Sequence, residues 1–157
     1  MNTASKIPII MALFQLNLIN SDQVIEWADK QIIKDSEPFD DILKLSTKGP
    51  KYCSRLVSAD FPAARELSYI EMFALKTAKL NPDNKEALEH FIQWVIRASL
   101  DAANNYELPE VQFGYFIDHY YYDCEDPDLT YMYIEESLTT LAPKNKPIAD
   151  AIWAEIE

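Results

Sequence analysis

Apolar residues recur at intervals of three and four along most of this chain, a spacing that predicts amphipathic helices. Polar and proline-containing breaks separate these segments, so we expect about seven helices joined by short connections. Their predicted ranges are 6–18, 21–34, 62–78, 82–104, 109–124, 126–141 and 147–156. A short helix near 38–48 and a brief one near 51–58 are also expected.

Cap and breaker residues set these boundaries. Ser21 is a plausible N-cap, and Asp60 followed by Pro62 has the form of a helix start. The pairs Asn81-Pro82 and Asp126-Pro127 give similar start signals, as does Pro109. Pro143 and Pro147 are expected to bracket a turn before the last helix, because proline disrupts a helix interior.

Composition narrows the fold class. The chain has 157 residues with 48% hydrophobic content but only two Gly, too few for the turns and bulges of a sheet protein. We therefore predict a single all-α domain over residues 1–157, arranged as a compact bundle or short solenoid. Two distant Cys exclude a disulfide framework and favour a reducing cytoplasm, and no segment has the length of a membrane span.

Charge is distributed unevenly. Of the net charge of −12, nearly all lies in residues 98–157, and residues 98–143 contain no Lys or Arg. The same cation-free stretch carries seven of the nine Tyr. Such a field repels phosphates and anionic lipid, which argues against nucleic-acid or membrane binding. It attracts a basic protein partner instead.

The predicted helix 109–124 combines acids and aromatic rings. Its stripe Phe113, Phe116, Ile117, Tyr120 and Cys124 is expected to face the core, which turns the other side outward. Tyrosine anchors interfaces and carboxylates match Arg or Lys on a partner. The candidate partner-binding residues are Tyr115, Asp118, Tyr122, Asp123, Glu125, Asp126, Asp128, Tyr133, Glu135 and Glu136. The alternative is that the rings fill the core and the acids form a solvated face.

The densest candidate chemistry lies in residues 118–128, which hold carboxylates, His119 and Cys124. A calcium loop would need a Gly at its sharp turn, and none is present. His119 and Cys124 are five positions apart, so an α-helix would not place both on one face for zinc. No nucleophile elbow or phosphate loop occurs. We therefore expect no metal, no cofactor and no enzymatic activity, with a metalloenzyme centred on 118–128 as the least favoured alternative.

A strongly acidic, Tyr-rich domain without a catalytic motif resembles the immunity proteins that bacteria make against secreted nuclease toxins. The run from Ala12 to Asp29, with its helix, turn and Asn20-Ser21-Asp22 start, also resembles a pattern of small helical bacterial proteins. What the resemblance implies is inhibition by binding, in which an acidic face docks on a basic toxin domain and occludes its active site. No functional residue is carried over from these families.

A second hypothesis is a helical peptide-binding scaffold. The phrase Leu80-Asn81-Pro82-Asp83-Asn84-Lys85-Glu86-Ala87-Leu88 resembles the junction between tetratricopeptide repeats. No second copy occurs at the repeat spacing of about 34 residues. Under this hypothesis the important residues would lie on facing helices of the near-neutral part of the chain, residues 1–97. Mutations in the acidic stretch would then have no effect on binding.

Overall fold

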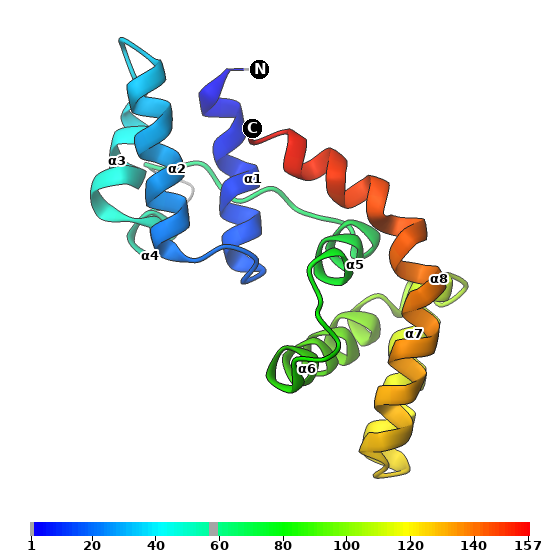
Figure 1. Cartoon of the computed structure of the whole chain (residues 1–157). Coiled ribbons are helices and arrows are strands. Elements are labelled where there is room, and N and C mark those ends of the chain that lie inside the picture. Colours follow the sequence, from blue (N-terminus) through cyan, green and yellow to red (C-terminus); the bar gives the residue numbers. More distant parts are fainter. Residues whose placement is uncertain (1, 57–59) are drawn as a thin grey trace. The chain divides into compact units, whose positions relative to one another are not determined.

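A computed structural model describes residues 2–56 and 60–157, and these residues form an all-α fold, as predicted (Figure 1). The α-helices are α1 (Thr3–Gln15), α2 (Ser21–Lys34), α3 (Asp40–Lys48), α4 (Pro50–Cys53), α5 (Tyr69–Ala78), α6 (Lys85–Asp101), α7 (Pro109–Asp118) and α8 (Pro127–Ala154). A 3₁₀ turn, η1 (Ala103–Asn105), follows α6, and a π-helical turn, η2 (His119–Asp123), follows α7.

The helices gather into two compact units. Unit 1 comprises Met1–Leu67 together with Ile152–Glu157, and unit 2 comprises Ser68–Ala151. Each unit has its own cluster of buried apolar side chains. Helix α8 belongs to unit 2 up to Ala151, and its last turn belongs to unit 1. The single domain expected over residues 1–157 stays a prediction.

The core of unit 1 forms because α1 is apolar on nearly all sides, while α2 and α3 each offer one apolar stripe. Ile7 and Ile10 of α1 pack with Val24 of α2 and Leu45 of α3, and all four are buried. The C-terminal residues close this unit. The Trp27 indole N–H donates to the carbonyl of Ile156 over 3.0 Å.

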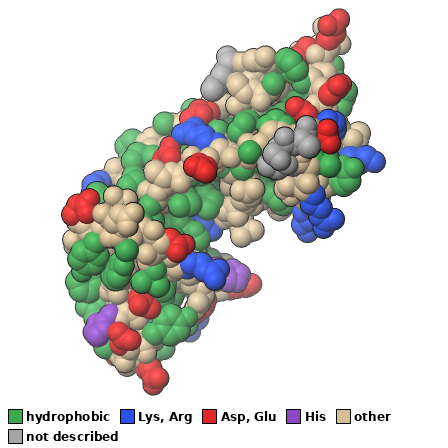
Figure 2. Space-filling model, turned by 180° about the vertical axis from the view of Figure 1, so that it is seen from behind, with side chains coloured by type: hydrophobic (Ala, Val, Ile, Leu, Met, Phe, Trp, Pro, Cys, Tyr) green, Lys and Arg blue, Asp and Glu red, His purple; other side chains and the backbone are tan. Residues whose placement is uncertain are grey.

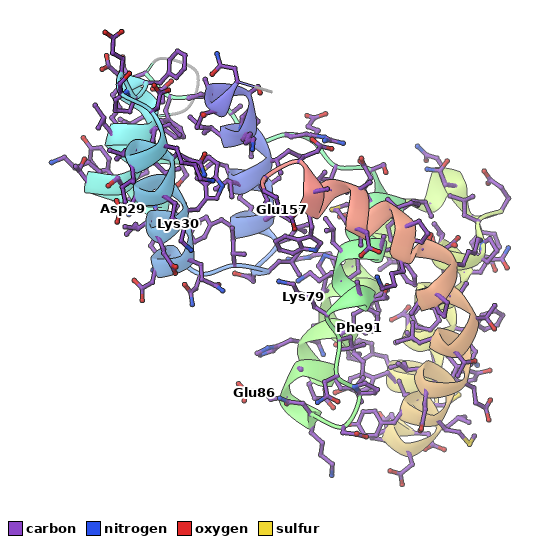
Figure 3. The ribbon with its side chains drawn as sticks, turned by 45° about the horizontal axis from the view of Figure 1, so that its top comes forward. Asp29, Lys30, Lys79, Glu86, Phe91 and Glu157 are labelled. Atoms are coloured by element: carbon purple, nitrogen blue, oxygen red, sulfur yellow. The ribbon has the colours of Figure 1, made fainter. Side chains whose placement is uncertain are left out.

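The core of unit 2 is rich in aromatic rings. Phe73 of α5 meets Phe113 of α7 edge to face, with ring centroids 5.7 Å apart. Phe91 points from α6 into the same interior, 6.2 Å from the Phe113 ring, whereas Glu86 at the start of α6 points away (Figure 3). Ile134 brings α8 into the cluster. Aromatic pairs of this kind hold α6, α7 and α8 together and so position the turn between α7 and α8.

Several predicted helix starts are shifted. Asn20, rather than Ser21, caps α2 through a reciprocal pair of hydrogen bonds with Gln23. Asn84, rather than Asn81, caps α6. Both corrections have one cause. In each case an Asn side chain accepts from the backbone N–H three residues later, a donor that has no partner within the first turn of the helix. The brief helix expected near 51–58 is the four-residue α4, and residues 57–58 of that prediction lie outside the described residues.

The helix predicted to begin at Asp60 and Pro62 is wrong in its first part. Residues 62–68 are not helical, and α5 begins at Tyr69. The reciprocal pair Ser68 and Glu71 caps that start, and the backbone N–H of Arg65 donates to the carbonyl of Pro8 over 2.9 Å. Pairing with α1 therefore replaces a helical hydrogen bond in this segment.

The turn expected between Pro143 and Pro147 is also absent, because α8 continues through both residues. Each proline deprives the carbonyl four positions earlier of its donor, and those carbonyls belong to Thr139 and Pro143. Both residues are exposed, so water can satisfy the freed oxygens and the helix is not forced to end.

Candidate functional site

The candidate site begins where α7 changes its hydrogen-bonding pattern. In η2 the backbone N–H of Cys124 donates to the carbonyl of His119, five residues earlier, over 2.9 Å. Glu125 follows with φ of +49°, and the N–H of Asp126 then donates to the carbonyl of Tyr120 over 3.1 Å. The wider turn and the left-handed residue reverse the chain into α8.

The acidic residues of this turn are exposed. We define the acidic turn as residues 123–128, and each of its four carboxylates lies at the surface. They belong to Asp123, Glu125, Asp126 and Asp128. The end of unit 2 that contains the turn between α7 and α8 shows Asp and Glu side chains beside hydrophobic ones (Figure 2).

Glu135 and Glu136 of α8 are exposed as well, while Asp118 is half-buried. Asp128 and Glu135 lie seven positions apart on α8, a spacing that places them on one face of the helix. Asp126 has a structural task in addition. Its carboxylate accepts from the backbone N–H of Leu129 over 3.0 Å and so caps α8.

The predicted tyrosines divide into two groups. Tyr122 is 50% exposed, as expected, and its hydroxyl donates to the Gln93 side chain on α6 over 3.0 Å. Tyr115 is half-buried and packs edge to face on Tyr106, with centroids 5.0 Å apart. Tyr133, expected to face outward, instead packs between α7 and α8.

Tyr133 is the centre of an aromatic seam. Its ring stacks on Phe113 at 5.7 Å and meets Phe116 at 5.9 Å and Tyr120 at 5.2 Å. Burial raises the pKa of its hydroxyl. Phe116 and Cys124, which the stripe placed inside, are both exposed. Tyr133 therefore contributes to the site by holding α8 against α7, because ring size lets it fill the space between them.

Sequence reasoning missed a side-chain cluster on Glu89. Tyr121 of η2 donates its hydroxyl to one Glu89 oxygen over 2.8 Å, and Tyr131 of α8 donates to the other. These bonds raise the pKa of both phenols, that of Tyr131 to about 12. No local signal in the sequence pairs a carboxylate on α6 with rings more than 30 positions later. Glu89 thereby fixes the positions of η2 and α8.

A second cluster contains His119, Asp123 and Cys124, which sequence reasoning named as candidate chemistry without expecting the thiol and imidazole to meet. The Cys124 Sγ lies 3.6 Å from Nε2 of His119, and Nδ1 of the same ring lies 3.1 Å from an Asp123 oxygen. In a regular α-helix, residues five apart are rotated by about 140°. The π-turn removes this separation, which is why helical spacing predicted that the thiol and imidazole would not share a face.

Unit 2 also has an open cavity of about 390 Å³ between α5 and the end of α6. Tyr69, Met72 and Trp94 supply its apolar walls, and Arg97 and Asp101 lie beside them. Its volume is within the range of small-ligand sites, about 300 to 1,000 Å³. None of the predicted binding residues lines it.

Within residues 2–56 and 60–157, no three or more His, Cys, Asp or Glu side chains are placed to share a metal ion. The described helices likewise include none with the length and apolar character needed to cross a bilayer. No protein-family model, curated protein or solved structure matches this chain.

Proposed function

We propose that this protein binds a basic protein partner through the exposed acids of residues 118–136. The observation that carries the proposal is that the acidic turn projects four carboxylates into solvent within a stretch that contains no Lys or Arg. Uncompensated carboxylates of one sign give a local negative potential that accelerates the approach of a cationic surface.

The rigid support of the turn favours binding over a purely solubilising role. Tyr121 and Tyr122 tie η2 to α6, and Asp126 caps α8, so the acids are held on an ordered frame. Preorganised groups lose less conformational entropy when a partner docks. Tyr122 adds a half-exposed ring beside the charges, the type of residue that anchors protein interfaces.

Within this class we propose an inhibitor of a nuclease-type toxin, acting as an immunity protein that occludes the active site. Enzymes that bind nucleic acid present Lys and Arg to phosphates. A surface that mimics the negative charge of the phosphates would occupy those cations and exclude the substrate. This proposal predicts competition between the protein and nucleic acid for the toxin.

The test begins with capture on the tagged full chain from its source organism at low and at moderate salt. The captured protein is then produced separately, and its association rate with wild type and variants is measured by stopped flow. Glu125→Lys, Asp128→Lys and Glu135→Lys are suitable because these three side chains are exposed and make no hydrogen bond or ion pair with the described part of the chain. We expect the triple variant to associate at least 10-fold more slowly at low salt, with a weaker salt dependence.

Glu107→Lys is the matched control, because Glu107 is exposed in the same cation-free stretch but lies before α7. It should leave the rate within about two-fold of wild type. An unchanged rate in the triple variant would refute the proposed binding surface. Retained binding without any inhibition of nucleic-acid cleavage would refute only the nuclease inhibitor.

The cavity beside Trp94 favours the peptide-binding scaffold as a second candidate function. Tyr69, Met72 and Trp94 of its walls lie within residues 1–97, the near-neutral part of the chain that this hypothesis specified. If it holds, Trp94→Ala should abolish capture of the partner while the charge-reversal variants leave it intact. The opposite pattern supports the acidic surface.

A further inference from the structure

We propose that Cys124 is a reactive thiol that exchanges with small disulfides, with His119 as its proton acceptor. The proposal is independent of the partner-binding function, since it concerns the chemistry of one side-chain group. It rests on three residues that the π-turn brings together and on the exposure of their reactive atoms.

The first observation is the contact between thiol and imidazole. Cys124 Sγ and His119 Nε2 are 3.6 Å apart, within hydrogen-bonding distance for sulfur. A thiol becomes a nucleophile only on losing its proton, and an adjacent base accelerates that loss. The π-turn hydrogen bond between the backbones of the same two residues holds this contact in place.

The second observation concerns the other ring nitrogen. His119 Nδ1 lies 3.1 Å from Asp123 Oδ2, and a carboxylate can only accept there. Nδ1 therefore carries the ring proton, which leaves the lone pair of Nε2 directed at the thiol. Asp123 is a positioning residue that selects this tautomer and stabilises the imidazolium once it forms.

The exchange is balanced within these groups and a disulfide. The proton of Cys124 passes to His119 Nε2, the sulfur attacks one sulfur of the disulfide, and a new S–S bond forms as the old one breaks. The departing thiolate takes the proton back from His119. The product is a mixed disulfide on Cys124 and one free thiol, so no other oxidant or reductant takes part.

Access and charge define the class of disulfide. Cys124 is exposed, and the side chains of His119 and Asp123 are 56% and 70% exposed. Glu125, Asp126 and Asp128 follow Cys124 within four positions of the chain, are exposed, and give this turn a negative charge. Anionic disulfides are repelled by that field and cationic ones are attracted. We therefore expect cationic disulfides, such as cystamine, to be the preferred partners.

The second cysteine provides an internal reference. Cys53 is fully buried in unit 1, and burial raises the pKa of its thiol. It should react only when the protein unfolds. A Cys53→Ala variant leaves Cys124 as the single thiol and simplifies the kinetics.

The experiment follows mixed-disulfide formation by intact-protein mass spectrometry at neutral pH, with cystamine and with the anionic reagent dithionitrobenzoate. The reference rate is that of Cys124 in the same protein unfolded in urea. We expect folded Cys124 to react with cystamine at least 10-fold faster than this reference. The His119→Gln substitution should lower the folded rate to that of the unfolded protein. The ratio of the reaction rate with cystamine to that with dithionitrobenzoate should be larger for the folded than for the unfolded protein.

Asp123→Asn tests the positioning role against Glu125→Gln, which removes an equal charge next to the thiol without contacting His119. The Asp123 variant should react several-fold more slowly than the Glu125 variant. A folded rate equal to the urea rate would overturn the proposal. So would a His119→Gln variant that keeps its helical circular dichroism and reacts as fast as wild type.

Discussion

The Tyr121 hydroxyl donates to Glu89 over 2.8 Å and so joins the π-turn to helix α6. The same carboxylate accepts a second bond from Tyr131 of α8. One side chain therefore sets the position of both elements that flank the acidic turn. The residues that carry the proposed functions depend on Glu89 although it contacts none of them.

Removal of this acceptor should loosen unit 2. Glu89→Ala deletes two hydrogen bonds to a charged group, and we expect the free energy of unfolding to fall by about 1 to 2 kcal/mol. Glu86→Ala, at an exposed position one turn earlier on α6, is the control. It should lower the free energy of unfolding by less than about 1 kcal/mol. Urea denaturation followed by circular dichroism measures both. Equal losses would contradict the role of Glu89.

The same bonds predict a late tyrosine titration. The hydrogen bond that Tyr131 donates to Glu89 raises the pKa of the Tyr131 phenol from 10.0 to about 12. Because the folded pKa is higher than the unfolded one, this stabilisation is complete below pH 10 and is lost as pH rises through 12. Tyrosinate absorbance followed against pH should show that a fraction of the phenols ionises at higher pH than an ordinary tyrosine. Glu89→Ala should move part of that fraction towards pH 10, and an unchanged curve would exclude the assigned cause.

Glu110 predicts a loss of stability at acid pH. This carboxylate is buried, and burial alone would raise its pKa. Bonds from Lys144 at 2.8 Å and Asn145 at 3.0 Å outweigh burial and hold the pKa below 4.5. Since the folded pKa is the lower one, this stabilisation is present above pH 4.5 and is lost as pH falls through the folded value.

Lys144→Met isolates that interaction. We expect a loss of about 1 kcal/mol at pH 7 that shrinks towards zero at low pH, where Glu110 is protonated in both proteins. Lys146→Met is the control, because Lys146 pairs with Asp150 at the surface, the two being 63% and 58% exposed. The control should cost less than about 0.5 kcal/mol at every pH. A loss of equal size at all pH values for Lys144→Met would count against the pairing.

At Gly114, helix α7 lies close to α6. A Cβ at this position would lie 2.4 Å from the Cβ and Oγ of Ser99, which is itself fully buried. Gly114→Ala should therefore lower the free energy of unfolding by about 2 kcal/mol, although Ala favours helix elsewhere. The double variant with Ser99→Gly should cost less than the sum of the single variants. Strict additivity would show that the two positions do not meet.

Glu125 occupies a left-handed conformation, with φ of +49°, that glycine adopts without strain. Glu125→Gly and Glu125→Ala remove the same charge, so the difference between them reports the backbone alone. The Gly variant should be more stable than the Ala variant by about 1 kcal/mol, as measured by thermal unfolding. Equal stabilities would argue against the left-handed turn that leads into α8.

By itself, the sequence determines that the chain is all-α. The scarcity of Gly argues against a sheet protein, and apolar residues at intervals of three and four predict helices. Start signals such as Pro109 and Asp126-Pro127 act within one or two helical turns, and α7 and α8 begin where these signals predict. These features are readable because their causes are local in the chain.

Only the tertiary structure decides which rings are buried and how the candidate site is arranged. Tyr133 packs inward because Phe113 on α7 meets it, and residues 62–68 are not helical where the Arg65 backbone bonds to Pro8 of α1. The π-turn aligns His119 with Cys124, against the spacing of an ordinary helix. Each outcome depends on partners distant in the sequence or on a rare hydrogen-bonding register, and neither leaves a periodic signal along the chain.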